Sequence, residues 1–471
     1  MDQVRESIVS NAKLNLVRNT QNTSGQEHTL FSDFVNALTG KLSHIVINIL
    51  IGVATARIWG AEGRGLITMV LIWPTIIATL FELGLMRALP FMVGKRLLPL
   101  ADAGKVICTL WLASSSMSAG ITLLAITLIL GEELTWPWLI ITSLSVGIQL
   151  LANFTRGFAL AIQRPRYLTR FIFIKGPISL LTILLFGWAM GLTAPTQAWI
   201  YIAAHTIGFA VAAGYGLRLI GHHSKLGLTR NVKGLFSIAS NTMRFGLSGF
   251  IMHLNYHVDM FLLCLPVFMI TKNDIGNYTV GVAAAGLLWQ IPRSLGILLH
   301  SRGAVATNPI AFSRQVASTA RGSIVLALPV MIVLFFAAPT LFPLVYGKSF
   351  GKAGAVLQIL SPAILAFFGA RIFEAGFNAL GHTKPINLIM GATVLLNVIL
   401  NILWIPRYGL YGAAYASALT YPLGTLGLGI AFAKINMMTI REVFMPRVSD
   451  LTPVTQRLQK VLRSITRATD R

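Results

Sequence analysis

The sequence predicts an all-α polytopic membrane protein of about 12 transmembrane helices in two six-helix bundles. Three observations support this fold class. Only 11% of the 471 residues are charged, and the mean hydropathy is +0.71, whereas a soluble protein would carry far more charge. Apolar runs of roughly 20 residues recur along the chain, as a bilayer span requires. Basic residues gather in alternate loops, as they do in cytoplasmic loops of membrane proteins.

The apolar runs fall into two sets of six predicted spans. The first set is 33–57, 64–90, 104–130, 135–157, 168–190 and 196–220, and the second is 241–267, 275–300, 322–345, 355–380, 385–405 and 408–433. The corresponding domains are an N-terminal segment 1–32, a bundle 33–221, a linker 222–240, a second bundle 241–433 and a basic tail 434–471. Apolar positions share one face from Leu451 to Ile465, which predicts an amphipathic helix on anionic lipid; a disordered basic tail is the alternative.

The charge distribution predicts the orientation of the chain. Loops predicted on the inner side carry Lys95, Arg96, Lys105, Arg164, Arg166, Arg218, Lys225, Arg230, Lys233, Arg302, Arg314 and Lys384. Outer loops carry Glu132, Glu133 and Asp274, with Lys272 and a few scattered bases such as Arg64 and Arg407. Both termini are therefore expected in the cytoplasm. The net charge of +23 follows from these loops and needs no nucleic-acid partner.

A short motif occurs once in each predicted bundle. "GFALAIQRP" (157–165) closes the fourth span and "GFNALGHTKP" (376–385) closes the tenth. With Asn378 taken as one inserted residue, the Gly-Phe, Ala-Leu and basic-Pro pairs align. Both copies are expected on the same side of the membrane, which predicts a parallel repeat of two six-span units.

Ionisable residues inside predicted spans are costly and commonly line a cavity. They are Lys41, Glu82, Arg87, Arg156, Lys175, Arg244, Asp259, Arg293, Arg371 and Glu374. Bases outnumber acids in this set, so a shared cavity would suit an anion. Arg87, Arg156 and Arg244 could instead reach headgroups at the membrane surface, and Arg371 with Glu374 could be a local structural pair.

No pattern for catalysis or metal binding stands out. The two cysteines, Cys108 and Cys264, lie in apolar runs and give no metal spacing. His253 and His257 are one helical turn apart, but no third ligand completes a site. Phosphate-binding loops, zinc-protease helices and nucleophile elbows are not found, so neither an enzyme nor a cofactor is expected.

Four stretches resemble the polysaccharide flippase family, the Wzx-type exporters of the MOP superfamily. They are "ARIWGAEGRGLITMV" (56–70), "MRFGLSGFIMHLNYHVDMFLL" (243–263), "LVYGKSFGKAGAVLQILSP" (344–362) and "NLIMGATVLLNVILNILWIPRYGLYGAAYASALTY" (387–421). One departure is His257, where the family usually has Arg or Lys. That departure puts in doubt a permanent ion pair beside Asp259.

The resemblance implies a V-shaped molecule around a central cavity, in the bacterial cytoplasmic membrane. Its cargo would be an undecaprenyl-pyrophosphate-linked oligosaccharide, moved from the inner to the outer leaflet by alternating access for O-antigen, capsule or exopolysaccharide synthesis. Membrane lipids, a polymerase and a chain-length regulator are the other expected partners. The cationic cavity would comprise Lys41, Arg87, Lys175, Arg244, Arg293 and Arg371. Coupling or gating would involve Glu82, His257, Asp259 and Glu374, with proton and sodium both open as the coupling ion.

Three alternatives are weighed against this function. A MATE-like exporter of drugs or small cations should favour carboxylates in its cavity, whereas bases are in excess here. A membrane enzyme of glycan assembly needs large outer loops, and those of this chain are short. A lipid II-type flippase is a close relative, but such proteins usually carry two further spans.

Overall fold

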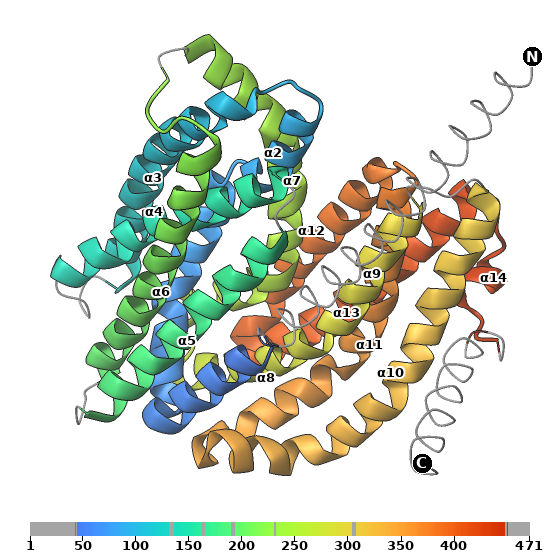
Figure 1. Cartoon of the computed structure of the whole chain (residues 1–471). Coiled ribbons are helices and arrows are strands. Elements are labelled where there is room, and N and C mark those ends of the chain that lie inside the picture. The colour runs from blue at the N-terminus through green and yellow to red at the C-terminus, as the bar shows by residue number, and fades with distance from the viewer. Residues whose placement is uncertain are drawn as a thin grey trace, which may run out of the picture.

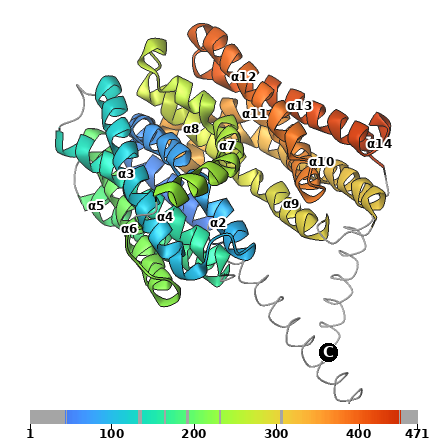
Figure 2. The same cartoon turned by 90° about the horizontal axis from the view of Figure 1, so that it is seen from above.

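The computed structural model describes residues 43, 45–130, 136–162, 165–189, 194–229, 232–303, 308–447 and 450, and these contain helices and no strand. The helices form two groups, one from each half of the chain (Figure 1). Seen from above, α3–α6 lie on one side and α10–α13 on the other, with α7 and α8 between them (Figure 2).

The first half begins with a long helix, Ile45–Phe81. It continues with α2 (Leu85–Gly94), α3 (Leu100–Leu130), α4 (Trp136–Ala161), α5 (Pro165–Ala189) and α6 (Ala194–His223). The long helix bends sharply at Gly60, whose φ of +67° is accessible to glycine at little cost. The predicted turn between spans 33–57 and 64–90 is this bend, and the residues 33–42 lie outside the described part.

The second half contains α7 (Val232–Leu263), the 3₁₀ turn η1 (Pro266–Phe268), α8 (Lys272–Leu288) and α9 (Gln290–Gly303). It continues with α10 (Pro309–Tyr346), the turn η2 (Lys348–Phe350), α11 (Gly351–Ala379), α12 (Thr383–Tyr408), α13 (Leu410–Ile435) and α14 (Ile440–Phe444). The predicted span 275–300 is divided into α8 and α9 at Trp289, three residues before Pro292. A proline here removes a backbone donor and interrupts the helix.

Nine helices of the described residues are long and apolar enough to cross a membrane. The bent first helix covers two predicted spans, so these nine account for ten of the twelve. Helix α7 and the pair α8–α9 occupy the other two. Large apolar side chains are widely exposed, for example Leu128, Phe336 and Leu388 at 76–77%. Such exposure suits lipid contact and not water.

The two halves repeat one packing order. In the first half α4 packs on α2, α3 and α6, and α5 packs on α6. In the second half α11 packs on α8–α9, α10 and α13, and α12 packs on α13. The repeated motif holds equivalent places, because Phe158 in α4 and Phe377 in α11 are both fully buried near the ends of their helices. The packing agrees with a parallel repeat.

The halves pack on each other along the first helix, where the ring centroids of Trp73 and Phe261 of α7 lie 4.5 Å apart. Two closer backbone contacts flank this pair, and we name them by the ends of the molecule. At the bend end, around Gly60, the first helix contacts α8: a Cβ on Gly276 would lie 2.8 Å from the carbonyl carbon of Ala61. Towards the tail end, where α2 and α13 end, α2 contacts α7: a Cβ on Gly246 would lie 2.9 Å from the backbone nitrogen of Gly84. The backbone of Gly65 also meets Gly276, and Gly65 and Gly84 are 19 residues apart, or about 28 Å of helix. Both contacts bring backbones together where only glycine fits.

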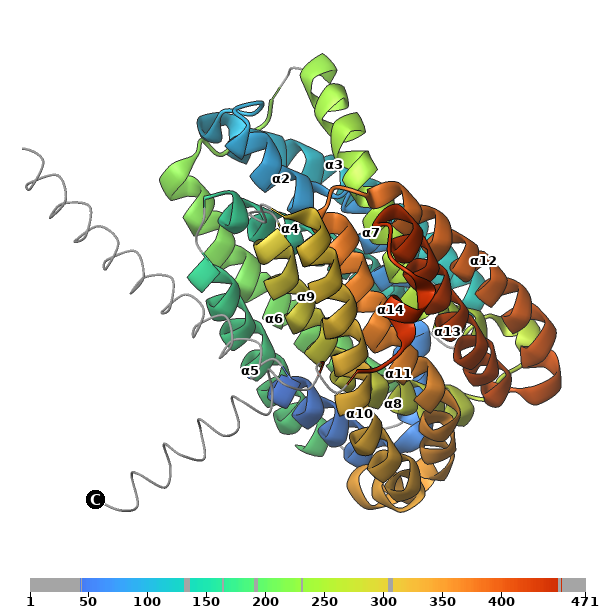
Figure 3. The ribbon, with the colours of Figure 1, turned by 90° about the vertical axis from the view of Figure 1, so that its right-hand side faces the viewer.

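Parts of the predicted linker and tail belong to helices. Residues 232–240 belong to α7, and α13 extends to Ile435. Helix α14 packs against α10 and α13 (Figure 3). Its start has a capping box, in which Thr439 and Glu442 satisfy each other's backbone amides. The predicted amphipathic helix after Leu451 lies outside the described residues.

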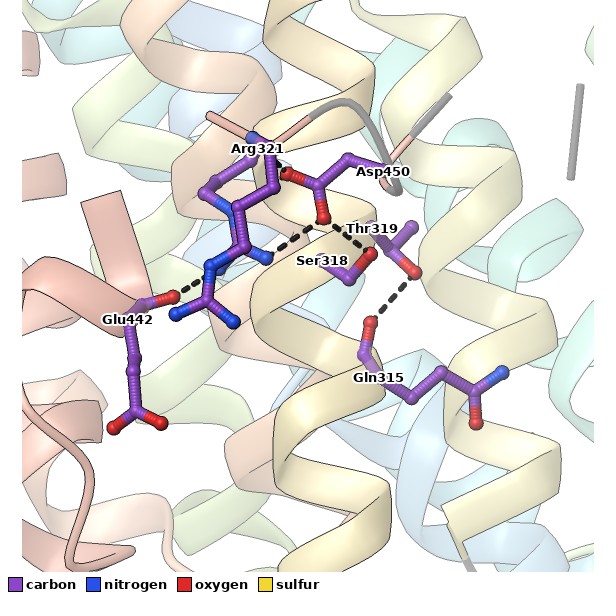
Figure 4. Close-up of polar contacts among 7 residues, drawn as sticks. Gln315, Ser318, Thr319, Arg321, Glu442 and Asp450 are labelled. Atoms are coloured by element: carbon purple, nitrogen blue, oxygen red, sulfur yellow. Dashed lines mark hydrogen bonds and ion pairs between the residues drawn. The ribbon is translucent and has the colours of Figure 1, made fainter. Parts of the chain in front are cut away.

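An ion pair fixes the chain beyond α14 to α10 (Figure 4). Arg321 donates to both carboxylate oxygens of Asp450, from Nε at 2.8 Å and from Nη2 at 2.7 Å. Ser318 donates to the same carboxylate at 2.7 Å, and Arg321 also donates to the Glu442 carbonyl. Both charged side chains are nearly inaccessible. We call Arg321, Ser318 and Asp450 the tail clamp.

Candidate functional site

The second half contains a buried carboxylate, Asp259 of α7, with only hydroxyl and amide donors around it. Its Oδ1 accepts from the backbone nitrogen of Met260 at 2.7 Å. Its Oδ2 accepts from Tyr278 of α8, through a short hydrogen bond, and from Ser417 of α13 at 3.1 Å. Asp259 is 3% exposed. Among the described residues, no basic side chain is within ion-pair distance of it.

The polar network continues from Asp259 into α12. The Asn397 amide donates to Ser417 at 3.2 Å and to Thr420 at 2.9 Å. Asn401 donates to the Asn397 side-chain oxygen at 2.9 Å, and its own Oδ1 is buried with no hydrogen-bond partner. A carboxylate, hydroxyls and amide oxygens are the ligand types of hard cations, and the same set can also hold a proton.

Asn255, one turn before Asp259 in α7, also faces the interior of the second half. Asn255 contacts Met390 of α12, and Tyr421 of α13 donates to the Asn255 carbonyl at 2.5 Å. As an ionisable residue within a span, Asp259 is expected to line a cavity. The packing of α7 on α12 and α13 turns that helix face inward instead.

Arg371 and Glu374, expected in different roles, pair with each other on α11. Arg371 Nη1 lies 2.5 Å from Glu374 Oε2. The Arg371 guanidinium also lies over the rings of Tyr256, at 4.7 Å, and Phe367, at 4.8 Å. Trp289 and Tyr421 extend this aromatic cluster. The charge of Arg371 is thus already compensated.

In the first half, two basic side chains are held mainly by aromatic rings. Lys175 Nζ of α5 lies 3.9 Å from the centroid of Phe209 of α6. The Arg156 guanidinium of α4 lies 5.2 Å from the centroid of Phe171 and donates to Asn153 at 3.4 Å. Within the described part of the chain, no carboxylate lies within 4.0 Å of either.

The rings belong to a row along α6. Tyr201, His205 and Phe209 recur every four residues on one helix face, with ring centroids 5.8 Å and 4.9 Å apart. Phe171 of α5 extends the row, 6.3 Å from Phe209. At the other end of the row, Arg64 of the first helix lies 5.9 Å from the Tyr201 centroid.

The remaining predicted residues are placed only in part. Lys41 lies outside the described residues, and the side chains of Arg87 in α2 and Arg244 in α7 are likewise not described. Arg293 is exposed on α9. Glu82, at the end of the first helix, accepts from Asn153 at 3.3 Å. The ring of His257 in α7 lies against that of His253, with centroids 4.4 Å apart and planes tilted by 43°, and His257 does not bond Asp259.

Several site residues were not predicted. Tyr278, Ser417 and Thr420 are hydroxyls in apolar helices, and nothing in their local sequence marks them as partners of Asp259. The ring row of α6 could have been found, because Tyr201, His205 and Phe209 have the spacing of one helix face. In the described part of the chain, no group of three His, Cys, Asp or Glu side chains could hold a metal.

Comparison with known proteins places this geometry in a fold. No protein-family model matches the chain, and no curated protein matches it in sequence. A lipid II flippase MurJ in an inward closed conformation is similar in structure, with a TM-score of 0.68 and 16% identity over 88% of this chain and 89% of that one. The fold is that of the MOP superfamily transporters.

Two further structures agree. An inward-facing MATE multidrug resistance transporter has a TM-score of 0.62 with 14% identity, covering 86% of this chain and 98% of that one. A MOP superfamily transporter from Pyrococcus furiosus has a TM-score of 0.59, also with 14% identity, over 86% and 95% of the two chains. The MOP fold and the exposed apolar helices make this chain a multi-pass membrane protein.

Proposed function

We propose that the protein is a flippase for a lipid-linked oligosaccharide with a pyrophosphate headgroup. It would move the headgroup and glycan from the inner to the outer leaflet of a bacterial cytoplasmic membrane, for polysaccharide synthesis. The observation that carries the proposal is the pair Lys175 and Arg156, two cations within membrane-spanning helices with no carboxylate of the described residues at ion-pair distance. A buried cation without a counter-ion is expensive, and a bound anion removes that cost.

The two glycine contacts support alternating access. The first helix touches α8 at Gly276, and α2 touches α7 at Gly246, so backbones of the two halves meet at both ends. Each contact would close one end of a central space that opens between the halves during transport. Opening either contact alone would expose that space to one side. A side chain at Gly246 or Gly276 would hold the two backbones apart. Glycine at both positions therefore allows the tail end and the bend end each to close.

The Asp259 network supports ion coupling in the second half. A carboxylate bound only by hydroxyl and amide donors can lose a cation or a proton without breaking an ion pair. Helices α7, α8, α12 and α13 all contribute to it. A change in occupancy would therefore alter how α7 packs, and α7 also carries the Gly246 contact with α2.

Glycan export tests the proposal. Lys175→Gln and Arg293→Gln variants should insert at normal level but lose most export of the glycan, because each removes a positive charge without adding a clash. Lys352→Gln is the matched control: it removes a lysine that already pairs with Asp274 at 2.7 Å. Unchanged export from both test variants would count against an anionic cargo.

Export of organic cations is the second candidate, and the aromatic cluster of Tyr256, Trp289 and Phe367 favours it. Apolar aromatic pockets commonly bind drug-like molecules. The Arg371 guanidinium already lies over the Tyr256 and Phe367 rings of that cluster, however, so a second cation would have to displace it. A lipid II-type cargo shares the pyrophosphate headgroup, so competition between glycans of different composition is needed to separate it from the proposed cargo.

A further inference from the structure

The first half holds its buried cations differently from the second half. Arg371 in the second half has a carboxylate partner at 2.5 Å as well as two rings. Lys175 and Arg156 have ring faces in place of that carboxylate. This contrast concerns the same kind of position, a basic side chain inside a membrane bundle, and it requires a physical explanation.

A ring and a carboxylate hold a cation with different strength. A cation over an aromatic face gains about 0.5–2 kcal/mol, whereas removing one partner of a buried ion pair costs about 3–5 kcal/mol. A ring-held cation can therefore be transferred to an incoming anion at little cost. A cation paired with a buried carboxylate cannot, because the carboxylate would be left alone.

The two ring-held cations are also close to each other. The rings that hold them, Phe209 and Phe171, have centroids 6.3 Å apart. Lys175 and Arg156 are near enough for their charges to repel. Glu82 is the nearby acid, and it interacts with Arg156 but is bonded to Asn153. Two adjacent cations match a ligand with two or more negative charges.

Resting on the proposed function, we infer that Lys175 and Arg156 form the capture site for a pyrophosphate headgroup, with Phe209 and Phe171 holding the two cations while the site is empty. The headgroup oxygens replace the ring faces as partners of Nζ and of the guanidinium. The side chains of Lys175 and Arg156 act only as hydrogen-bond donors, and the planar guanidinium of Arg156 can donate two parallel hydrogen bonds to phosphate oxygens. Tyr201 and Arg64 repeat the same arrangement further along α6.

Binding of farnesyl pyrophosphate to the purified full-length protein in detergent tests this site. Farnesyl monophosphate serves as a probe with less negative charge, and farnesol as a probe with no charge. The wild type should bind the pyrophosphate more tightly than the monophosphate, and farnesol most weakly. Lys175→Gln and Arg156→Gln should each weaken pyrophosphate binding about tenfold or more, because each removes a charged donor. Farnesol binding should stay unchanged.

Two further variants make the result specific. Lys175→Arg keeps the charge and should keep pyrophosphate binding within about threefold, well under the loss expected for Gln. Lys352→Gln should bind as the wild type does. Pyrophosphate binding that is equal in wild type, Lys175→Gln and Arg156→Gln would overturn the site.

Export measured on the same variants separates this site from the flippase function. Normal pyrophosphate binding with lost export in Lys175→Gln would reject the capture site and leave the flippase proposal standing. A wild type that prefers farnesol, with export unaffected by both variants, would reject both.

Discussion

At the scale of single residues, the neighbours of each buried carboxylate decide the role that it can take. Asp259 accepts three hydrogen bonds from Tyr278, Ser417 and Met260, whereas Asp450 faces a guanidinium. We expect the first to exchange a cation or proton with its surroundings, as the proposed ion coupling requires, and the second to remain a structural anion. Two predictions follow this difference.

Asp259→Asn should uncouple transport from its driving ion. The substitution keeps the shape of the side chain but removes the charge that a cation or proton would balance. In proteoliposomes, flipping by the variant should run only downhill and should no longer respond to a proton or sodium gradient. A full rate with an intact gradient response would show that Asp259 has no coupling role.

The tail clamp should be sensitive to acid. Burial raises the pKa of Asp450, but hydrogen bonds from Arg321, Ser318 and the Arg447 amide outweigh it and hold this pKa at about 2. Because the folded value lies below the unfolded value near 3.9, the stabilisation of about 2 kcal/mol is present above pH 4 and is lost as the pH falls towards 2. Thermal unfolding of Asp450→Asn should therefore show a lower midpoint than wild type at pH 7, and the gap should narrow by pH 3. An equal gap at both pH values would contradict this account.

At the scale of elements, helix positions were predictable from the sequence and side-chain orientation was not. Apolar run length located the spans, because a bilayer fixes that length. The bend at Gly60 and the break at Trp289 depend on backbone conformations that hydropathy does not record. Asn255 and Asp259 are one helical turn apart and share a helix face, but whether that face meets a cavity or α12 depends on distant segments.

Replacing glycine by alanine at the two close contacts should open opposite ends of the molecule. Gly246→Ala should separate α2 from α7 and open the tail end, while Gly276→Ala should separate the first helix from α8 and open the bend end. Neither has a positive φ, so alanine itself is not strained. Gly120→Ala is the matched control, because a Cβ there meets nothing within 4 Å.

Cysteine labelling with an impermeant maleimide would read out these states. In a background without Cys108 and Cys264, a reporter at Thr242 should label faster in Gly246→Ala, and one at Thr279 should label faster in Gly276→Ala. The reporters lie at the two contacts, since Thr242 faces Gly84 and Thr279 bonds Thr68 at 3.0 Å. Parallel increases at both reporters in one variant would indicate general loosening and not alternating access.

At the scale of the whole molecule, the packing repeat and the loop charges together predict an orientation. Helices α2 and α13 end on the same side, next to loops rich in Lys and Arg, which is the side expected to face the cytoplasm. Single cysteines at positions 100, 225 and 455 should be protected from an impermeant reagent added outside intact cells. Positions 133 and 273 should react. Labelling of position 225 from outside would reject the orientation.

The most direct measurement of the central proposal is flipping by the purified protein in proteoliposomes. A fluorescent oligosaccharide linked to a polyprenyl pyrophosphate is placed in both leaflets, and a reagent that cannot cross the membrane quenches the outer pool. We predict that the protein makes the inner pool accessible over time, that Lys175→Gln slows this strongly, and that Lys352→Gln does not. An inner pool that stays protected, in vesicles that nonetheless transport an organic cation such as ethidium, would contradict the account and favour the exporter.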